Sequence, residues 1–480
     1  MGVSATVAAL AKGDPQHAPL FFAGARAWAG AFGSAIASVR TLSGVLGLLL
    51  LPGVFLLSRQ LFSDRRVAAL ATLFVALSPY HVFYAREARP YSLLACAAVW
   101  SSVLLLRAEH RRGAWHWALY GATVAVGLYS HLLFALVLLA QCLHVTIRWA
   151  RGTNDPPGRR SLALRFGVAA GAAVLSFLPW GIVVWTNMPT VRQQLAWMSN
   201  PVEAPFRLVG MWAFNYSSPF FDVGDAGALA DGLELADAFG YLARAGILVV
   251  SLLGVVHVAR GRHVCRGRVL LLGLIGLPFL AVAAPDLLFG GRRSGIGAQY
   301  LGVSFLGVQL AVAALLCWLD LRSGWRRRAA GAVIVSLLVL SMASAGLVAT
   351  AESWWLAPEF NFNRRVAGLV NAHERPLAIQ LVDAILLSLA HHYSPEVTVL
   401  PVAEGDVVEL PEGFDQTFVL RPLDDELSRQ GGLVVEPTDV HGLATVRRVS
   451  VARSRWPRPV LGTRIRERGL AVLSFRHADP

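Results

Sequence analysis

Three charged side chains interrupt a strongly apolar part of the sequence: Arg86, Glu87 and Arg89, in the stretch LSPYHVFYAREARPYSLLACA. A guanidinium group presents a planar fork of N–H donors that matches two phosphate oxygens at once. A carboxylate beside such groups can hold one fork in place or accept a proton. The residue types therefore predict binding of an anion. The alternative is that the three side chains reach a membrane interface and pair with one another.

Two prolines indicate how the chain positions these charges. Pro79 has no backbone N–H to donate, and Pro90 disfavours helical geometry at the residue before it. We therefore expect one helix to loosen and end near residues 86–89. The next helix would begin with Pro90 in its first turn. The charges would then lie at one end of two neighbouring helices.

The whole chain has the composition of a membrane protein. Of its 480 residues, 55% are hydrophobic and 15% are charged, against about 25% charged in soluble domains. The net charge of +13 falls in short clusters between apolar runs, so no nucleic-acid partner is expected. Ten runs approach the roughly 20 residues that cross a bilayer. They are about 41–58, 67–85, 92–106, 115–130, 131–148, 164–186, 241–259, 269–286, 300–319 and 329–350.

Arginine-rich loops alternate with arginine-poor loops, which predicts the orientation in the membrane. By the positive-inside rule the arginine-rich loops are cytoplasmic. These loops are 59–66, 107–114, 149–160, 260–268 and 320–328. Residues 86–91, 187–240, 287–299 and everything after 350 then lie outside. Both termini are expected outside, although the first residues lack the basic start and apolar core of an export signal.

The composition changes near residue 351, where the long apolar runs stop. Strands are expected at PLAIQLV, EVTVLPV, TFVLRP, LVVEP and ATVRRVSV, and helices at DAILLSLAHHY and DDELSRQ. We therefore predict an all-α polytopic membrane domain over residues 1–350 and a small α/β extracytoplasmic domain over 351–480. The four scattered cysteines predict neither a disulfide framework nor a metal cluster.

Three short segments resemble, in order, landmarks of the polytopic GT-C glycosyltransferases. HAPL at 17–20 stands where that family has a His-Pro-Pro-Leu segment, and EARPY at 87–91 where it has a Glu-x-x-Arg-x-Tyr-like segment. QYL at 299–301 stands in place of Arg-Tyr-Leu. The chain most resembles the bacterial protein O-mannosyltransferase and aminoarabinose-transferase-like enzymes, and is also similar to lipopolysaccharide-core galacturonosyltransferases. The resemblance covers about residues 1–350 and, more loosely, the outer domain.

The resemblance implies a fold of about ten transmembrane helices and an inverting glycosyltransferase. Such an enzyme moves a sugar from a polyprenyl-phosphate donor to a glycan, lipid or protein acceptor at the outer face of the bacterial cytoplasmic membrane. It needs a carboxylate to take the acceptor's proton and cations to stabilise the departing phosphate. Its partners are these two substrates and membrane lipids; no cofactor is expected, and a metal is not indicated.

Asp14 is the preferred catalytic base because it precedes His17 in the segment that resembles the acceptor-side loop. A turn residue in GDP is the alternative. Glu87 is the second candidate, although we expect it to orient an arginine. The remaining candidates are assigned to the donor phosphate or to the cavity. The phosphate ligands are Arg86, Arg89, Tyr91, Arg292 and Arg293, and the cavity residues are His17, His131 and Tyr300.

The sequence departs from the family pattern at two places. The family's first crossing and the acid after it have no counterpart, so we expect a first helix to be missing. Gln299 replaces an arginine, for which Arg292 or Arg293 can substitute; interfacial anchoring is the alternative for that pair. Because this acid is missing, an inactive truncated paralogue is an alternative interpretation. A transporter or flippase of lipid-linked sugars is the other rival, but it should carry mid-span charges or broken helices in related halves.

Overall fold

The computed structural model describes most of the chain, with gaps. The described residues are 2–111, 113–151, 159–199, 205–223, 234–261, 267–350, 363–381, 392–402, 407–409, 414, 416–422, 432–438, 445–452, 464–467 and 470–476. The chain divides into two compact units, Met1–Thr350 and Ala351–Pro480.

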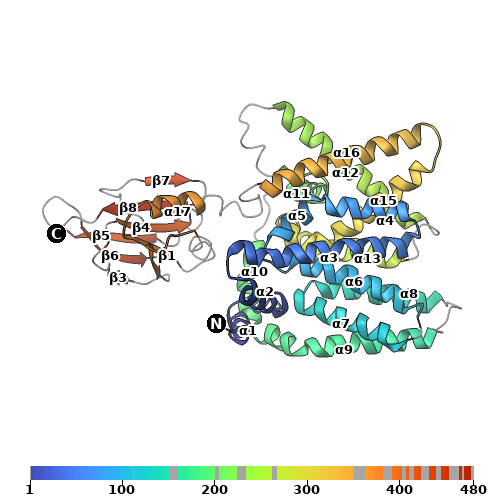
Figure 1. The fold of residues 1–480 in the computed structure, drawn as a ribbon, viewed down its shortest axis with the longest axis horizontal. Coiled ribbons are helices and arrows are strands. Elements are labelled where there is room, and N and C mark those ends of the chain that lie inside the picture. The colour runs from blue at the N-terminus through green and yellow to red at the C-terminus, as the bar shows by residue number, and fades with distance from the viewer. Residues whose placement is uncertain are drawn as a thin grey trace. The chain divides into compact units, whose positions relative to one another are not determined.

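The first unit is built of helices, several of which lie roughly parallel to one another while others cross them at an angle (Figure 1). Its first half contains α1 (Val3–Gly13), α2 (Pro19–Phe32), α3 (Ile36–Phe62), α4 (Arg65–Ala76), α5 (Pro79–Arg86), α6 (Tyr91–Ala108), α7 (Ala114–Ser130), α8 (Phe134–Arg151) and α9 (Arg159–Thr186). Its second half contains α10 (Met188–Leu195), η1 (Ala196–Ser199), α11 (Pro205–Ser217), α12 (Glu234–Arg260), α13 (Arg268–Phe289), α14 (Arg293–Ile296), η3 (Ala298–Leu301), α15 (Gly302–Asp320) and α16 (Trp325–Thr350).

Among the described residues, seven helices are long and apolar enough to cross a membrane, or up to eight if a bent pair counts as one crossing. This confirms a polytopic membrane protein. The expected fourth and fifth crossings correspond to α7 and α8, which are separate helices of 17 and 18 residues and are not among the seven. The first two helices, α1 and α2, were not expected as elements.

The helices differ in how much of their surface is buried. The apolar windows of α6 and α15 are 78% and 89% buried, whereas those of α9 and α12 are each 22% buried. A helix that is apolar all round but exposed on most of its surface suits contact with lipid. The centre of the unit is therefore formed by α6 and α15, with α9 and α12 at its periphery.

The bent pair is α4 and α5, which meet at 54°. Pro79 is the first residue of α5, and α5 ends at Arg86. Pro90 then forms the N-cap of α6. The two prolines thus divide the chain where the sequence predicts, because neither can continue a helix through the preceding turn. The charged stretch lies in the short turn between α5 and α6.

Gln309 of α15 connects both sides of this bend. Its Nε2 donates to the Phe74 carbonyl in the last turn of α4, at 3.2 Å, and to the Pro219 carbonyl at 3.4 Å. Its Oε1 lies 3.1 Å from Nε2 of His81 in α5. Gln309 is fully buried, so these contacts satisfy polar groups that water cannot reach.

The second unit contains one described helix and two sheets. α17 (Asn363–Asn371) precedes the strands β1 (Pro376–Leu381), β2 (Thr398–Val402), β3 (Val407–Glu409), β4 (Gln416–Pro422), β5 (Gly432–Thr438), β6 (Thr445–Ala452), β7 (Arg464–Glu467) and β8 (Leu470–Arg476). One sheet has the order β2-β1-β4-β8-β7 and the other β3-β6-β5. The five expected strands match β1, β2, β4, β5 and β6. The two expected helices lie almost entirely outside the described residues.

Strand β1, which lies between β2 and β4, pairs in parallel with both of them in the larger sheet. Ala378 pairs with Val399 of β2 and with Phe418 of β4, and both pairings are parallel. β8 then pairs antiparallel with β4. Ala378 is fully buried and Phe418 is 4% exposed. Parallel strands with buried apolar residues are typical of an α/β arrangement.

Candidate functional site

Asp14 and His17 lie in a tight turn between α1 and α2. The Asp14 N–H donates to the Leu10 carbonyl at 2.9 Å, ending α1, and the Asp14 carbonyl accepts from the His17 N–H at 2.9 Å. The Gln16 amide donates to Oδ1 of Asp14 at 3.2 Å. Asp14 is exposed and His17 is half-buried. The turn therefore presents a carboxylate to solvent with an imidazole close behind it.

Arg89 lies in a second tight turn, between α5 and α6. Its N–H donates to the Glu87 carbonyl at 2.8 Å, which folds the backbone back on itself. The Arg89 side chain is exposed. Its charge acts on Tyr91, which is two residues away, and on His17 and Tyr300, which come from distant parts of the chain. Arg89 thus lies within electrostatic range of all three.

Aromatic rings connect these turns to the end of α7 and to η3. The Tyr91 and His131 rings lie 5.7 Å apart, and those of His131 and Tyr300 lie 6.2 Å apart. His131 follows the last residue of α7, and its Nδ1 accepts from the Leu133 N–H at 3.1 Å. The neutral ring therefore carries its proton on Nε2. The six residues Asp14, His17, Arg89, Tyr91, His131 and Tyr300 form what we call the polar cluster.

Burial and charge set the pKa of His17 in opposing directions. Burial, the largest cause, lowers the pKa; the Asp14 carboxylate raises it and the Arg89 guanidinium lowers it. The result is a pKa below the ordinary 6.5. His17 is therefore neutral at neutral pH and can accept or relay a proton.

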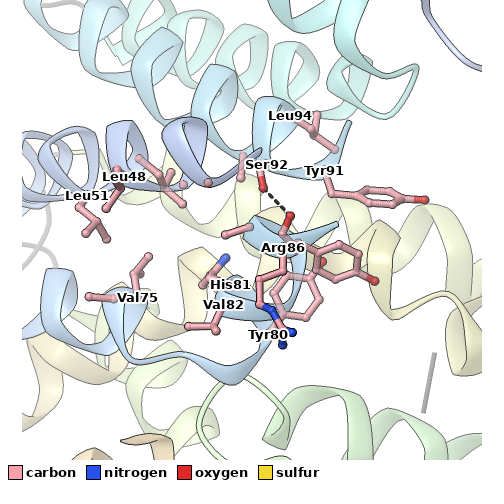
Figure 2. Close-up of a pocket in the computed structure, with 18 of the residues that line it drawn as sticks. Leu48, Leu51, Val75, Tyr80, His81, Val82, Arg86, Tyr91, Ser92 and Leu94 are labelled. Carbon is pink, nitrogen blue, oxygen red and sulfur yellow. Dashed lines mark hydrogen bonds between the residues drawn. The ribbon is translucent and has the colours of Figure 1, made fainter. Parts of the chain in front are cut away.

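An apolar cavity of about 360 Å³ adjoins this cluster. Figure 2 shows Leu48, Leu51 and Val75 toward one end of it, and Arg86 and Tyr91 toward the other. α3, α4, α5 and α6 contribute walls, and η3 and α15 contribute Gln299 and Gly302. A cavity with aliphatic walls and a cation at one end fits an amphiphile with an anionic head.

Tyr80 and Tyr84 also line the cavity, and the sequence reasoning did not single them out. Their rings lie 4.7 Å apart, and Tyr84 lies 4.9 Å from Tyr91. The Tyr80 hydroxyl donates to the Ala298 carbonyl of η3 at 3.3 Å. The signal in the sequence was their i, i+4 spacing, which places both on one face of a helix.

Arg86 and Glu87 lie at the end of α5, next to the cavity. Arg86 lines the cavity and donates to the Val348 carbonyl near the end of α16. Glu87 is half-buried and its charge acts on Arg86, as expected if it orients an arginine. Whether either residue handles substrate stays a prediction.

Arg293 forms a compact ion-pair network before η3. It donates to Oδ1 of Asp286 at 3.0 Å, and the Ser294 N–H and hydroxyl both donate to Oδ2 at 2.7 Å. Gly291 has φ +133°, and a Cβ there would lie 2.5 Å from the Arg293 guanidinium. Only glycine fits this turn. Arg293 thus has a structural role that the sequence did not reveal.

Arg292 differs from its neighbour in its side-chain contacts. Its backbone N–H donates to the Met198 carbonyl at 3.1 Å, whereas its buried Nε has no hydrogen-bond partner among the described residues. Arg292 therefore has more donor capacity available than Arg293 does. The proposed phosphate clamp that joins this pair to Arg86 and Arg89 stays a prediction.

The described residues contain no group of three or more His, Cys, Asp or Glu that could hold a metal ion. The polar cluster supplies one exposed carboxylate, one exposed guanidinium, two imidazoles and two phenols. Such groups can transfer a proton and bind an anion.

Comparison with known proteins places the fold. The oligosaccharyltransferase of Archaeoglobus fulgidus in the apo form is similar over 93% of this chain and 67% of its own, with a TM-score of 0.50 and 13% identity. ArnT from Cupriavidus metallidurans, bound to undecaprenyl phosphate, is similar over 91% and 88%, with a TM-score of 0.49 and 13% identity. The fold is that of the GT-C glycosyltransferases, as the resemblance implied.

The sequence itself matches a family over its first part. Residues 16–183 match the family described as dolichyl-phosphate-mannose-protein mannosyltransferase. The match includes His17, Arg89 and His131. The chain spans 56% of the length of the archaeal oligosaccharyltransferase AglB, another similar structure from Archaeoglobus fulgidus, with 13% identity, 79% of this chain covered and a TM-score of 0.47. No curated protein matches the sequence.

Proposed function

We propose that this protein is a membrane glycosyltransferase that uses a polyprenyl-phosphate-linked sugar. The observation that carries the proposal is the polar cluster beside an apolar cavity. The mannosyltransferase family match over residues 16–183 supports the same reaction class. We further propose that the cluster faces the outside of the bacterial cytoplasmic membrane, because the arginine-rich loops lie at the opposite ends of the helices.

The proposed reaction is a single displacement at the anomeric carbon. The acceptor hydroxyl or amine attacks this carbon and gives its proton to Asp14. The bond from the carbon to the phosphate oxygen breaks, and its electron pair leaves with the polyprenyl phosphate. One displacement inverts the configuration at the carbon.

Each part of the site has a role in this step. Asp14 is exposed, as a base that must reach an acceptor from outside has to be. Arg89 binds the donor phosphate and stabilises the charge that it gains on leaving. The aliphatic walls of the cavity hold the first isoprene units. His17, neutral at neutral pH, can hold the acceptor or relay its proton.

Transfer assays in proteoliposomes test this function. The probe is a synthetic polyprenyl-phosphate sugar in the presence of membrane extract as the source of acceptors, and the readout is release of polyprenyl phosphate. We expect release with wild-type protein and at least tenfold slower release with Arg89→Gln. Arg151→Gln, an exposed arginine at the last residue of α8, is the matched control.

Two results would overturn the proposal. One is transfer from a nucleotide sugar without any lipid-linked donor. The other is movement of the labelled lipid across the bilayer without its consumption, which is the behaviour of a flippase. Equal rates in Arg89→Gln and Arg151→Gln would remove Arg89 from the site.

A further inference from the structure

A second cavity lies between α7 and α9, which run side by side (Figure 1). Its volume is about 630 Å³, larger than that of the cavity at the polar cluster. At Gly121 the two helices approach closely, since a Cβ there would lie 2.9 Å from the Ala169 carbonyl oxygen. Most of the lining side chains are small, among them Ala118, Ala122, Ala125, Ala172 and Ala173. The helices thus leave a groove that their own side chains do not fill.

Two polar side chains line the same groove. Trp117 is 4% exposed, and its indole N–H has no hydrogen-bond partner among the described residues. A buried N–H without an acceptor is unfavourable, so such a donor indicates an acceptor that the described part of the chain does not supply. Arg165 of α9 is half-buried and also lines the groove. An N–H donor and a guanidinium in an apolar groove fit the oxygens of an anionic headgroup.

The length of the groove fits one leaflet of a bilayer. Along α7 it runs from Ala114 to Ala125, which at ~1.5 Å per residue is about 16 Å. Half of a ~30 Å hydrocarbon core is about 15 Å. At its far end the Tyr129 hydroxyl donates to the Ser176 carbonyl at 2.6 Å. Since α7 ends next to His131, the groove begins at the end of the helix away from the polar cluster.

The surface around the groove is suited to lipid. Leu164 and Val168 line it from α9 and are 68% and 64% exposed. On the same helix Leu175 is 65% exposed. Exposed aliphatic side chains on a membrane helix contact acyl chains, so the groove opens toward hydrocarbon and not toward water.

We propose that this groove binds an anionic phospholipid from the leaflet opposite to the polar cluster. One acyl chain lies along the small side chains of Ala118, Ala122 and Ala172, beside the close approach of the two helices at Gly121. A phosphate oxygen accepts from the Trp117 indole and pairs with Arg165. The site is distinct from the donor cavity, and its occupancy does not depend on the reaction at the polar cluster.

Native mass spectrometry with defined lipids tests this site. The probe is phosphatidylglycerol, titrated against phosphatidylcholine on the delipidated protein. We expect the wild type to retain one phosphatidylglycerol. Arg165→Gln and Ala122→Phe should each weaken retention at least fivefold, the first by removing the charge and the second by filling the groove. Trp117→Phe removes one donor and should weaken it about threefold.

Each variant has a matched control outside the groove. Arg151→Gln removes an exposed arginine from α8, Leu175→Phe enlarges a lipid-facing side chain of α9, and Trp115→Phe changes an exposed indole of α7. These three should retain the lipid as the wild type does, with unchanged thermal unfolding. Equal retention by the test and control variants, or equal binding of phosphatidylcholine, would overturn the proposal.

Discussion

The two ends of α6 carry charged residues of similar kinds in opposite states. At its C-terminal end, Glu109 has a side chain with no exposed surface, and its two oxygens meet His144 at 3.0 Å and Arg148 at 2.5 Å. At its N-terminal end, Arg89 is exposed and lies in electrostatic range of His17 and two tyrosines. A buried carboxylate with both oxygens paired holds helices together, whereas an exposed guanidinium can still bind a ligand. Whether a charged side chain here is structural or can bind a ligand depends more on how fully it is paired than on its residue type.

The largest expected effect is on stability at the Glu109 end. Glu109→Ala leaves His144 and Arg148 without their shared partner, which costs about 3 kcal/mol for a buried pair. Thermal unfolding in detergent should show a clear loss of stability. Asp320→Ala, which removes half-exposed ion pairs with Arg66 and Arg327, should cost less than about 1 kcal/mol. Equal losses of stability in Glu109→Ala and Asp320→Ala would contradict the comparison.

Acid should reduce the stability that Glu109 contributes at the C-terminal end of α6. Burial raises the pKa of Glu109, but the hydrogen bond from His144 and the nearby positive charges together lower it further, and the folded-state pKa lies below 4.5. The group's contribution to stability is therefore complete above about pH 4.5 and is lost as the pH falls through the lowered pKa. In Glu109→Ala this part of the acid sensitivity should disappear from the unfolding curves.

The next largest effect is on catalysis at the Asp14 end. Asp14→Asn keeps the shape of the side chain but cannot accept a proton, so kcat should fall about 100-fold, as for loss of a general base. Stability should not change because Asp14 is exposed. Glu87→Gln is the matched variant and should retain most of the rate. If Glu87→Gln slowed transfer much more than Asp14→Asn did, Glu87 would be the base.

Arg89 and Arg293 allow a finer comparison of an exposed and a paired guanidinium. Arg89→Lys removes the planar fork and should slow transfer about tenfold without a change in unfolding. Arg293→Lys weakens the pairing with Asp286 and should instead destabilise the protein by about 1–2 kcal/mol. Transfer rates and unfolding temperatures of the two variants test these two roles. Loss of stability in the first and of rate in the second would exchange the two roles.

The smallest effect is on the titration of His17. Arg89→Gln removes a charge that lowers the pKa of His17, so the pKa should rise, whereas Asp14→Asn removes a charge that raises it, so the pKa should fall. Histidine resonances followed by NMR against pH measure both shifts. Shifts in the same direction would show that one of the two charges is not near His17.

Some of this arrangement could be predicted from the sequence because it depends on local chemistry. Pro79 and Pro90 determine where α5 begins and where α6 begins, since proline restricts its own and the preceding residue. The strands of the second unit follow from alternating apolar residues. The helices α7 and α8 divide at His131, at the boundary that the apolar runs indicated.

Side-chain pairing that depends on turn geometry or on helix packing could not be predicted in the same way. That Arg293 and Ser294 both donate to the carboxylate of Asp286 depends on a turn with two positive-φ glycines, which the residue types alone do not specify. Similarly, the approach of His131 to Tyr300 depends on how α7 packs against other helices. The residue types of the polar cluster were predictable, but their meeting in space required the fold.

The contacts of the Gln309 amide indicate how a bent membrane crossing, such as the pair α4 and α5, can be recognised in other sequences. The amide joins the last turn of α4 to the first turn of α5 through one side chain on a third helix. Hydrocarbon offers no substitute for that contact. A lone glutamine in a long apolar run, together with a proline in another run, is thus a combination worth searching for when only sequence is known. It would mark a crossing that changes direction inside the bilayer.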